Sequence, residues 1–326
     1  MKIVITGASG MIGSCLVRHL NEMGLVDLVL IDDLKTGDKW KNLVGKQFDD
    51  ILSKHVLFDW LKSHGSSVDA IVHLGACSDT TEKNADYLIE NNFHYTVRLA
   101  EWALTHSKRF IYASSAATYG DGSLGFCDDE SALETLRPLN MYGYSKHLVD
   151  LWMKRRNVLS KVVGLKYFNV FGPNEYHKGR MASMVLKMMD KSHDGSAVHL
   201  FKSSDAKYPD GGQMRDFIYV KDAVKMTACF LDPQYRNVGG IFNIGLGVPT
   251  TWNQLADAFF QAIEKKTNIA YIDMPADLVK QYQQFTCASM DKFHKIFSQD
   301  SKVTQTTSIV DAVRDYVSYL KRNDRW

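Results

Sequence analysis

A glycine-rich turn directly after the first apolar segment restricts the fold more than any other feature of the sequence. Residues 2–6 (KIVIT) are apolar and β-branched, as in a buried parallel strand. Gly7, Gly10 and Gly13 follow, and we expect a helix from Met11 to about Gly24. Such glycines permit a tight turn, close approach of the backbone to a pyrophosphate, and close packing of helix on strand. The pattern predicts a doubly wound parallel α/β sheet that binds a dinucleotide at the helix N-terminus.

The end of the second predicted strand bears on which dinucleotide is bound. Asp32 and Asp33 lie there, and an acid at this place usually accepts the adenosine ribose hydroxyls, which favours NAD. Lys39 and Lys54 follow and could neutralise the 2′-phosphate of NADP, whereas Lys35 is better interpreted as a surface charge. These residues alone leave NADP and NAD both open.

Tyr142 and Lys146 form a candidate acid/base pair. They are four residues apart, so on a helix they share one face. A tyrosine ordinarily titrates near pH 10, and we expect the neighbouring ammonium to lower the pKa of Tyr142 toward a useful range. Ser115, just after the predicted strand 109–113, is suited to polarise a carbonyl, and Asn140 is the expected N-cap of the Tyr142 helix. An isolated pair of this kind would more often be a core tyrosine and a solvated lysine.

Small and amide side chains are expected to form the rest of the cofactor wall. The third predicted strand, residues 68–74, ends in the small residues 75–78. We interpret Cys77 as a wall residue because no paired histidine is evident. Helix 86–105 carries Asn91 and Asn92, of which one should bond backbone or cofactor; we expect Asn92 on the solvated face.

The regular alternation of strands and helices ends near Phe168, which suggests two domains. We expect a Rossmann domain of residues 1–168 with 216–246, and a smaller α/β substrate-binding domain of residues 169–215 with 247–326. Asp222 is the expected cap of the helix that follows it.

Composition excludes several classes of protein. The chain has 326 residues with a net charge of +2 and both signs interspersed, which argues against nucleic-acid binding. No apolar run approaches eighteen residues, so we expect neither a membrane span nor a signal peptide. Five scattered cysteines without CxxC fit a reducing cytoplasm, and the lack of HExxH or a His/Cys cluster predicts no metal site.

Five motifs together resemble the extended short-chain dehydrogenase/reductase family that acts on nucleotide sugars: GASGMIG, SSAATYG, YGYSK, FNVFGP and RDFIYVKD. The resemblance covers nearly the whole chain. Within the family, four segments are similar to the epimerases that act on C6 of ADP-heptose: HLGACSDTT, YASSAATYGDG, PLNMYGYSK and FNVFGPNEYHKGRMAS.

This resemblance implies roles for individual residues. Tyr142 would be one catalytic acid/base and Lys178 the second, with Ser115 assisting and Lys146 holding the nicotinamide ribose. The cofactor, NADP in this subfamily with NAD as the alternative, would be lined by Met11, Ile12, Asp32, Asp33, Lys39, Lys54, Leu74, Gly75, Ala76, Cys77, Ser78, Asn91, Val170 and Lys178. ADP-heptose would be held by Asn169, Arg180, Lys187, Phe201, Lys202, Ser203, Ser204, Arg215 and Tyr282.

Three of these residues differ from the subfamily pattern. Leu74 replaces an acid, Arg180 a serine and Lys187 a histidine. Arg180 and Lys187 suit a diphosphate, although they could equally be exposed helix charges.

The function implied by the resemblance is inversion of C6 in ADP-D-glycero-D-manno-heptose, by way of an aldehyde, to supply heptose for the lipopolysaccharide inner core. The resemblance also implies a cytoplasmic homo-oligomer in the form of a ring, such as a pentamer. A UDP-hexose 4-epimerase is the main alternative, and Lys178 discriminates against it. A 4,6-dehydratase would need an acidic pair where Ala116 and Ala117 stand. A non-catalytic, dinucleotide-sensing protein would commonly lack Tyr142 or Lys146.

Overall fold

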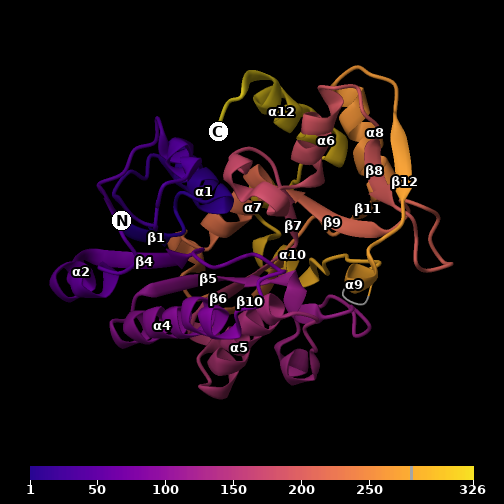
Figure 1. Cartoon of the computed structure of the whole chain (residues 1–326). Coiled ribbons are helices and arrows are strands. Elements are labelled where there is room, and N and C mark those ends of the chain that lie inside the picture. Colours follow the sequence, from indigo (N-terminus) through magenta and orange to yellow (C-terminus); the bar gives the residue numbers. More distant parts are fainter. Residues whose placement is uncertain (280–281) are drawn as a thin grey trace.

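A seven-stranded parallel sheet forms the centre of the molecule (Figure 1). The computed structural model describes residues 1–279 and 282–326. The strand order is β3-β2-β1-β4-β5-β6-β10, and the strands are β1 (Lys2–Thr6), β2 (Leu28–Ile31), β3 (Asp50–Leu52), β4 (Val68–His73), β5 (Arg109–Ser115), β6 (Val163–Tyr167) and β10 (Gly240–Ile244). The predicted doubly wound sheet is therefore confirmed. The strand order reverses between β1 and β4, and ligands bind at the carboxyl ends of such strands.

Helices cover both faces of this sheet because successive strand residues point to opposite sides. Val4 of β1 packs into one apolar cluster together with residues of three helices, α2 (Leu57–His64), α4 (Tyr95–Thr105) and α5 (Met141–Arg155). Ile3 and Ile5 pack into the other cluster, which includes residues of α1 (Met11–Glu22) and α7 (Val220–Cys229). Each such fully buried aliphatic side chain contributes about 1.5–3 kcal/mol.

The second part of the molecule is built from smaller sheets and a helical layer, and it lies in the upper part of Figure 1. Its strands form two sheets, of order β11-β9-β7 and β12-β8, from β7 (Asn169–Phe171), β8 (Val198–Phe201), β9 (Met214–Tyr219), β11 (Pro249–Thr251) and β12 (Ile269–Ile272). Its longer helices are α6 (Met184–Ser192), α8 (Trp252–Ala262) and α12 (Ile309–Arg322). Three short helices lie between α8 and α12 in the sequence, α9 (Ala276–Val279), α10 (Asp291–Phe297) and α11 (Ser301–Thr304). A fourth short helix, α3 (Ala85–Leu88), lies between β4 and β5 in the sequence. Within the described residues, no helix has the length and apolarity needed to cross a bilayer.

The helix caps are partly as predicted. Asn140 caps α5, since its side chain accepts a hydrogen bond from the Gly143 N–H at 2.8 Å. The prediction that Asp222 caps α7 is wrong. The N-cap is Tyr219, because β9 leads into the helix without a loop, and Asp222 lies inside the first turn. There its carboxylate accepts the Thr307 N–H at 2.7 Å.

The predicted helix 86–105 contains a π-helical turn. Residues Ile89–His94 form this turn between α3 and α4. A π turn holds more residues than an α turn, so side chains within it and after it point in other directions than they would on a regular α-helix. Asn92 is consequently fully buried, which contradicts its predicted place on the solvated face. The Asn92 Oδ1 accepts a hydrogen bond from the Cys77 N–H. The Asn92 Nδ2 donates to the Cys77 carbonyl and to Ser145 Oγ on α5, both at 3.0 Å.

Candidate active site

The glycine turn lies at the carboxyl end of β1 and leaves no room for larger residues. Gly7 has φ +68°, and a Cβ there would come within 2.7 Å of the Gly75 backbone. A Cβ on Gly13 would lie 2.1 Å from the Gly7 carbonyl oxygen. The N-cap of α1, Gly10, has no side-chain cap, so the first N–H groups of the helix remain available to an anion.

A cavity of about 550 Å³ opens beside this turn, and we call it the glycine-turn cavity. The predicted cofactor residues that follow β1 and β2 line this cavity, with the exception of Asp33 and Lys54. Residues 74–78, which follow β4, line it as well. These lining residues are Gly7, Gly10, Met11, Ile12, Gly13, Asp32, Lys39, Leu74, Gly75, Ala76, Cys77 and Ser78. The close backbone approach and the helix N-terminus together fit a pyrophosphate.

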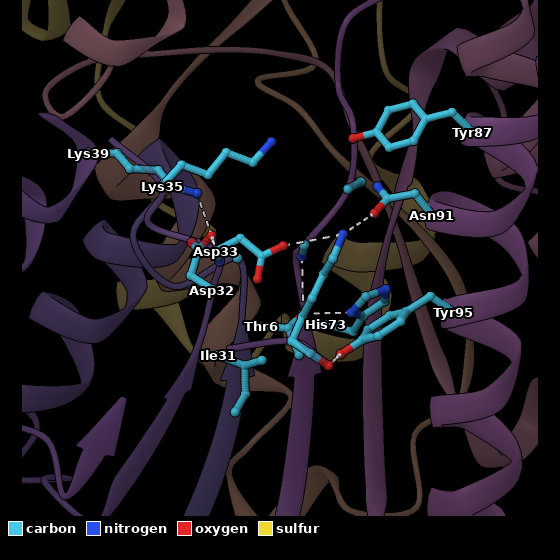
Figure 2. Close-up of a pocket in the computed structure, with 14 residues that line it drawn as sticks. Thr6, Ile31, Asp32, Asp33, Lys35, Lys39, His73, Tyr87, Asn91 and Tyr95 are labelled. Atoms are coloured by element: carbon cyan, nitrogen blue, oxygen red, sulfur yellow. Dashed lines mark hydrogen bonds and ion pairs between the residues drawn. The ribbon is translucent and has the colours of Figure 1, made fainter. Parts of the chain in front are cut away.

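A smaller pocket of about 150 Å³, the Asp32 pocket, continues from the cavity (Figure 2). Asp32 accepts hydrogen bonds from the N–H and Oγ–H of Ser9 at 2.9 and 2.5 Å, and its other oxygen pairs with Lys39 Nζ at 2.5 Å. Burial raises the pKa of Asp32, but the bonds from Lys39 and Ser9 outweigh burial and bring that pKa below its ordinary value. Asp32 is therefore an anion already held by donors from Ser9, Lys39 and the Asp33 backbone.

Lysines surround the second acid as well. Lys54 Nζ lies 3.4 Å from Asp33 and donates to Asn91 Oδ1 at 2.8 Å. Lys35, interpreted from the sequence as plain surface charge, is exposed but lines the Asp32 pocket. The pocket thus carries three lysines against two carboxylates.

The sequence analysis missed several residues of this pocket. Thr6 and His73 lie at the carboxyl ends of β1 and β4, and Tyr87 and Tyr95 face them from the helical side. The strand-end rule alone could have identified the first two. Tyr87 precedes the π turn and Tyr95 follows it, and no local sequence pattern predicted that turn.

Ser115, Tyr142 and Lys146 line the glycine-turn cavity together. Lys146 Nζ donates to the Ala113 carbonyl at 2.8 Å, and burial lowers the pKa of Lys146 to about 8. Burial raises the pKa of Tyr142, and a hydrogen bond with Ser115 opposes that rise. The expected lowering of the Tyr142 pKa by Lys146 is therefore wrong, because burial dominates and Lys146 Nζ is bonded to the Ala113 carbonyl.

Lys178 comes from the second part of the chain, in the 3₁₀ segment η7 (Tyr176–Met181). Its amine lies 3.7 Å from Met11 Sδ, at the start of α1, which places it over the glycine turn. Gly179 follows with φ +51° and ψ −124°, a break that a glycine accommodates readily. Lys178 lines the glycine-turn cavity together with Tyr142.

A second cavity of about 510 Å³, the outer cavity, adjoins the first. Of the nine predicted substrate residues, it is lined by Asn169, Lys187, Phe201 and Tyr282. The walls shared by both cavities are Ser78, Tyr142, Phe168, Val170, Lys178 and Met181. Tyr142 and Lys178 therefore stand where the two spaces meet.

The other five predicted substrate residues make contacts elsewhere. Arg180 forms an ion pair of 2.5 Å with Asp79, and Lys202 one of 3.0 Å with Asp273. Ser203 donates to the Asp205 carbonyl, and Ser204 accepts from Gln284.

Arg215 lies behind the wall of the outer cavity. It is 7% exposed, and its guanidinium stands 4.6 Å from the ring centre of Tyr282. It therefore supports a residue that lines the outer cavity.

The sheet, the glycine turn and the Tyr142–Lys146 helix define a dinucleotide-binding enzyme of the Rossmann type. The chain belongs to the NAD dependent epimerase/dehydratase family, whose model matches residues 3–245. It is 48% identical over 325 residues to a relative from Nitratidesulfovibrio vulgaris (strain DP4), with 98% of each chain covered, and that relative is named ADP-L-glycero-D-manno-heptose-6-epimerase. A relative of the same name from Fusobacterium nucleatum is 42% identical, with 99% of each chain covered.

Solved structures agree with this assignment. The crystal structure of the Helicobacter pylori ADP-L-glycero-D-manno-heptose-6-epimerase matches with a TM-score of 0.79 at 25% identity, over 98% of this chain and 96% of that chain. A UDP-glucuronic acid 4-epimerase from Bacillus cereus, in complex with UDP-glucuronic acid and NAD, matches with a TM-score of 0.79 at 24% identity, over 99% of this chain and 100% of that chain. The second similarity shows a shared fold.

Proposed function

We propose that this protein is an isomerase that inverts C6 of ADP-D-glycero-D-manno-heptose to give the L-glycero epimer, for the heptose of the lipopolysaccharide inner core. The observation that carries the proposal is the position of Tyr142 and Lys178. They come from different parts of the chain, and both line the glycine-turn cavity and the outer cavity. Two proton-handling groups on one reaction space are what an inversion through a planar carbon needs.

The chemistry follows from the kind of carbon to be inverted. A carbon that bears a hydroxyl group but no acidic C–H must be oxidised temporarily, and a bound nicotinamide supplies the hydride acceptor and donor for that purpose. One residue of the Tyr142–Lys178 pair takes the hydroxyl proton as the aldehyde forms. Rotation about C5–C6 would present the other face of the aldehyde carbon to the returning hydride. The other residue then donates a proton to the aldehyde oxygen, and Ser115 hydrogen-bonds that oxygen.

The sugar nucleotide would occupy the outer cavity. Lys187 faces this cavity, and burial lowers the pKa of its amine while the charge of Glu175 opposes that effect. An exposed amine that lines this cavity is suited to a diphosphate. The names of the relatives at 42–48% identity support ADP-heptose as the sugar nucleotide.

For the cofactor we propose NADP. The Asp32 pocket carries one more lysine than it has carboxylates, and Asp32 is already occupied by Ser9 and Lys39. A 2′-phosphate would meet a net positive wall there. Denaturing the purified protein and identifying the released nucleotide by mass spectrometry tests this, and NAD as the released species would refute it.

The substrate is tested by incubating the protein with ADP-D-glycero-D-manno-heptose and, separately, with UDP-glucose, and then resolving the products. We expect the heptose epimer and unchanged UDP-glucose. Unchanged ADP-heptose together with epimerised UDP-glucose would refute the proposal. Light scattering of the same sample tests the expected homo-oligomer.

A further inference from the structure

Glu175 is a fully buried carboxylate three residues before Lys178. One of its oxygens accepts hydrogen bonds from the hydroxyls of Ser183 and of Tyr316, the latter at 2.8 Å. The other oxygen accepts the Ser183 N–H at 2.8 Å. All three partners are donors, so the ionised form of Glu175 satisfies every one of them.

The remaining neighbour of this carboxylate is the Lys178 amine. Its Nζ lies 3.6 Å from Glu175 Oε2, on the same oxygen that accepts the Ser183 N–H. Lys178 is 23% exposed and lines both cavities, whereas Glu175 is hidden behind it. The pair thus consists of a buried anion and a cation at the cavity wall.

Other charged and titratable groups face Lys178 as well. Lys187 of α6 and His177 of its own loop interact with its charge, and Tyr142 and Lys146 of α5 share its cavity. Burial lowers the pKa of His177 to about 4, so His177 is neutral near pH 7. Asp32 is paired with Lys39, and Asp79 with Arg180. Among the residues that the structure describes, Glu175 is therefore the carboxylate that forms an ion pair with Lys178.

We propose that Glu175 is a positioning residue for Lys178, holding its amine between the two cavities through a buried negative charge 3.6 Å from Nζ. The inference rests on the proposed function, in which Lys178 is the second acid/base. The anchor itself is held by two elements, since Ser183 is the N-cap of α6 and Tyr316 belongs to α12. Glu175 accordingly connects the helical layer of the second part to the loop that reaches over the glycine turn.

A purely structural role for Glu175 makes a different prediction. Capping of α6 and the bond to Tyr316 would both be independent of Lys178, so removing the charge would leave the protonation of Lys178 unchanged. Tyr316→Phe removes one bond to the carboxylate and keeps its charge, whereas Glu175→Gln removes the charge and keeps the shape. The two variants therefore separate electrostatic support of Lys178 from packing.

The first experiment needs no substrate. Trace acetylation with acetic anhydride across a pH series, followed by peptide mass spectrometry, measures the pH at which Lys178 becomes half reactive. In Glu175→Gln we expect this midpoint to fall, because the ammonium loses the opposite charge that lies 3.6 Å from it. In Tyr316→Phe we expect a midpoint within a few tenths of the parent value. An unchanged midpoint in folded Glu175→Gln overturns the proposal.

Glu175→Asp covers the case in which Glu175→Gln does not fold. It keeps the negative charge but draws it back by one methylene, so the midpoint should fall by a smaller amount. A midpoint equal to that of the parent protein in this variant also overturns the proposal.

The second experiment follows turnover of ADP-heptose. If Glu175 acts through Lys178, then Glu175→Gln lowers kcat in the parent protein and has no further effect on kcat in a Lys178→Met background. An equal loss in both backgrounds contradicts the proposal. If the parent protein does not epimerise ADP-heptose, the proposed function fails, and the labelling experiment still decides the role of Glu175.

Discussion

Replacing Lys146 by Met should change how stability depends on pH. Lys146 is 2% exposed, and burial lowers its pKa from the ordinary 10.5 to about 8 in the cofactor-free protein. Because the folded-state pKa is the lower one, the unfolded chain binds more protons between these two values, and the penalty on folding fades as pH rises through this window. Below pH 8 the penalty is complete and amounts to about 3 kcal/mol.

The magnitude between two accessible pH values follows from the same pair of pKa values. From about pH 7 to pH 9.5 the parent protein should gain about 2 kcal/mol of unfolding free energy relative to Lys146→Met. Lys146→Met also loses the hydrogen bond to the Ala113 carbonyl. This loss lowers the unfolding free energy by about the same amount at both pH values, so it cancels in the comparison. Urea unfolding of both cofactor-free proteins at the two pH values measures the difference.

An exposed lysine provides the control for this experiment. Lys62 has a side chain that is 76% exposed, so Lys62→Met should show nearly the same offset from the parent at both pH values. A pH-independent difference for Lys146→Met, or a change of the opposite sign, would refute the reasoning that burial governs this amine.

Three further predictions concern the cavities. Tyr142→Phe should lower kcat for ADP-heptose by about 10²–10⁴ while the cofactor stays bound, and a kcat near that of the parent would exclude Tyr142 as an acid/base. Gly13→Ala should abolish co-purification of the dinucleotide, because the new Cβ would stand 2.1 Å from the Gly7 carbonyl oxygen, and released nucleotide at the parent level would contradict this. Lys39→Ala should weaken binding of NADP about tenfold more than that of NAD, since loss of about 1.4 kcal/mol of phosphate contact corresponds to tenfold in affinity; titration of the cofactor-free protein checks it, and equal weakening would argue against a 2′-phosphate at Lys39.

Local patterns predicted the central features correctly. The apolar run before Gly7 became β1, the glycine turn lies at its carboxyl end, and Asn140 caps the helix of Tyr142 and Lys146. These features depend on residues within a few positions of one another. Periodicity, glycine conformational freedom and capping are local effects, so a sequence displays them directly.

Long-range packing decided what the sequence did not show. Asn92 is buried within the π turn, and burial outweighed the Ser115 hydrogen bond in setting the pKa of Tyr142. The family resemblance predicted Arg180 as a substrate-binding residue. In the folded chain Arg180 instead pairs with Asp79, which lies 101 positions away in the sequence.

The sequence by itself determined the parallel sheet, the dinucleotide turn and the tyrosine–lysine helix. Only the tertiary structure decided that Lys178 meets Tyr142 at a shared wall, and that Glu175 stands behind Lys178. The physical reason is that desolvation and charge pairing depend on distances in space. Those distances arise only when segments far apart in the chain pack against one another.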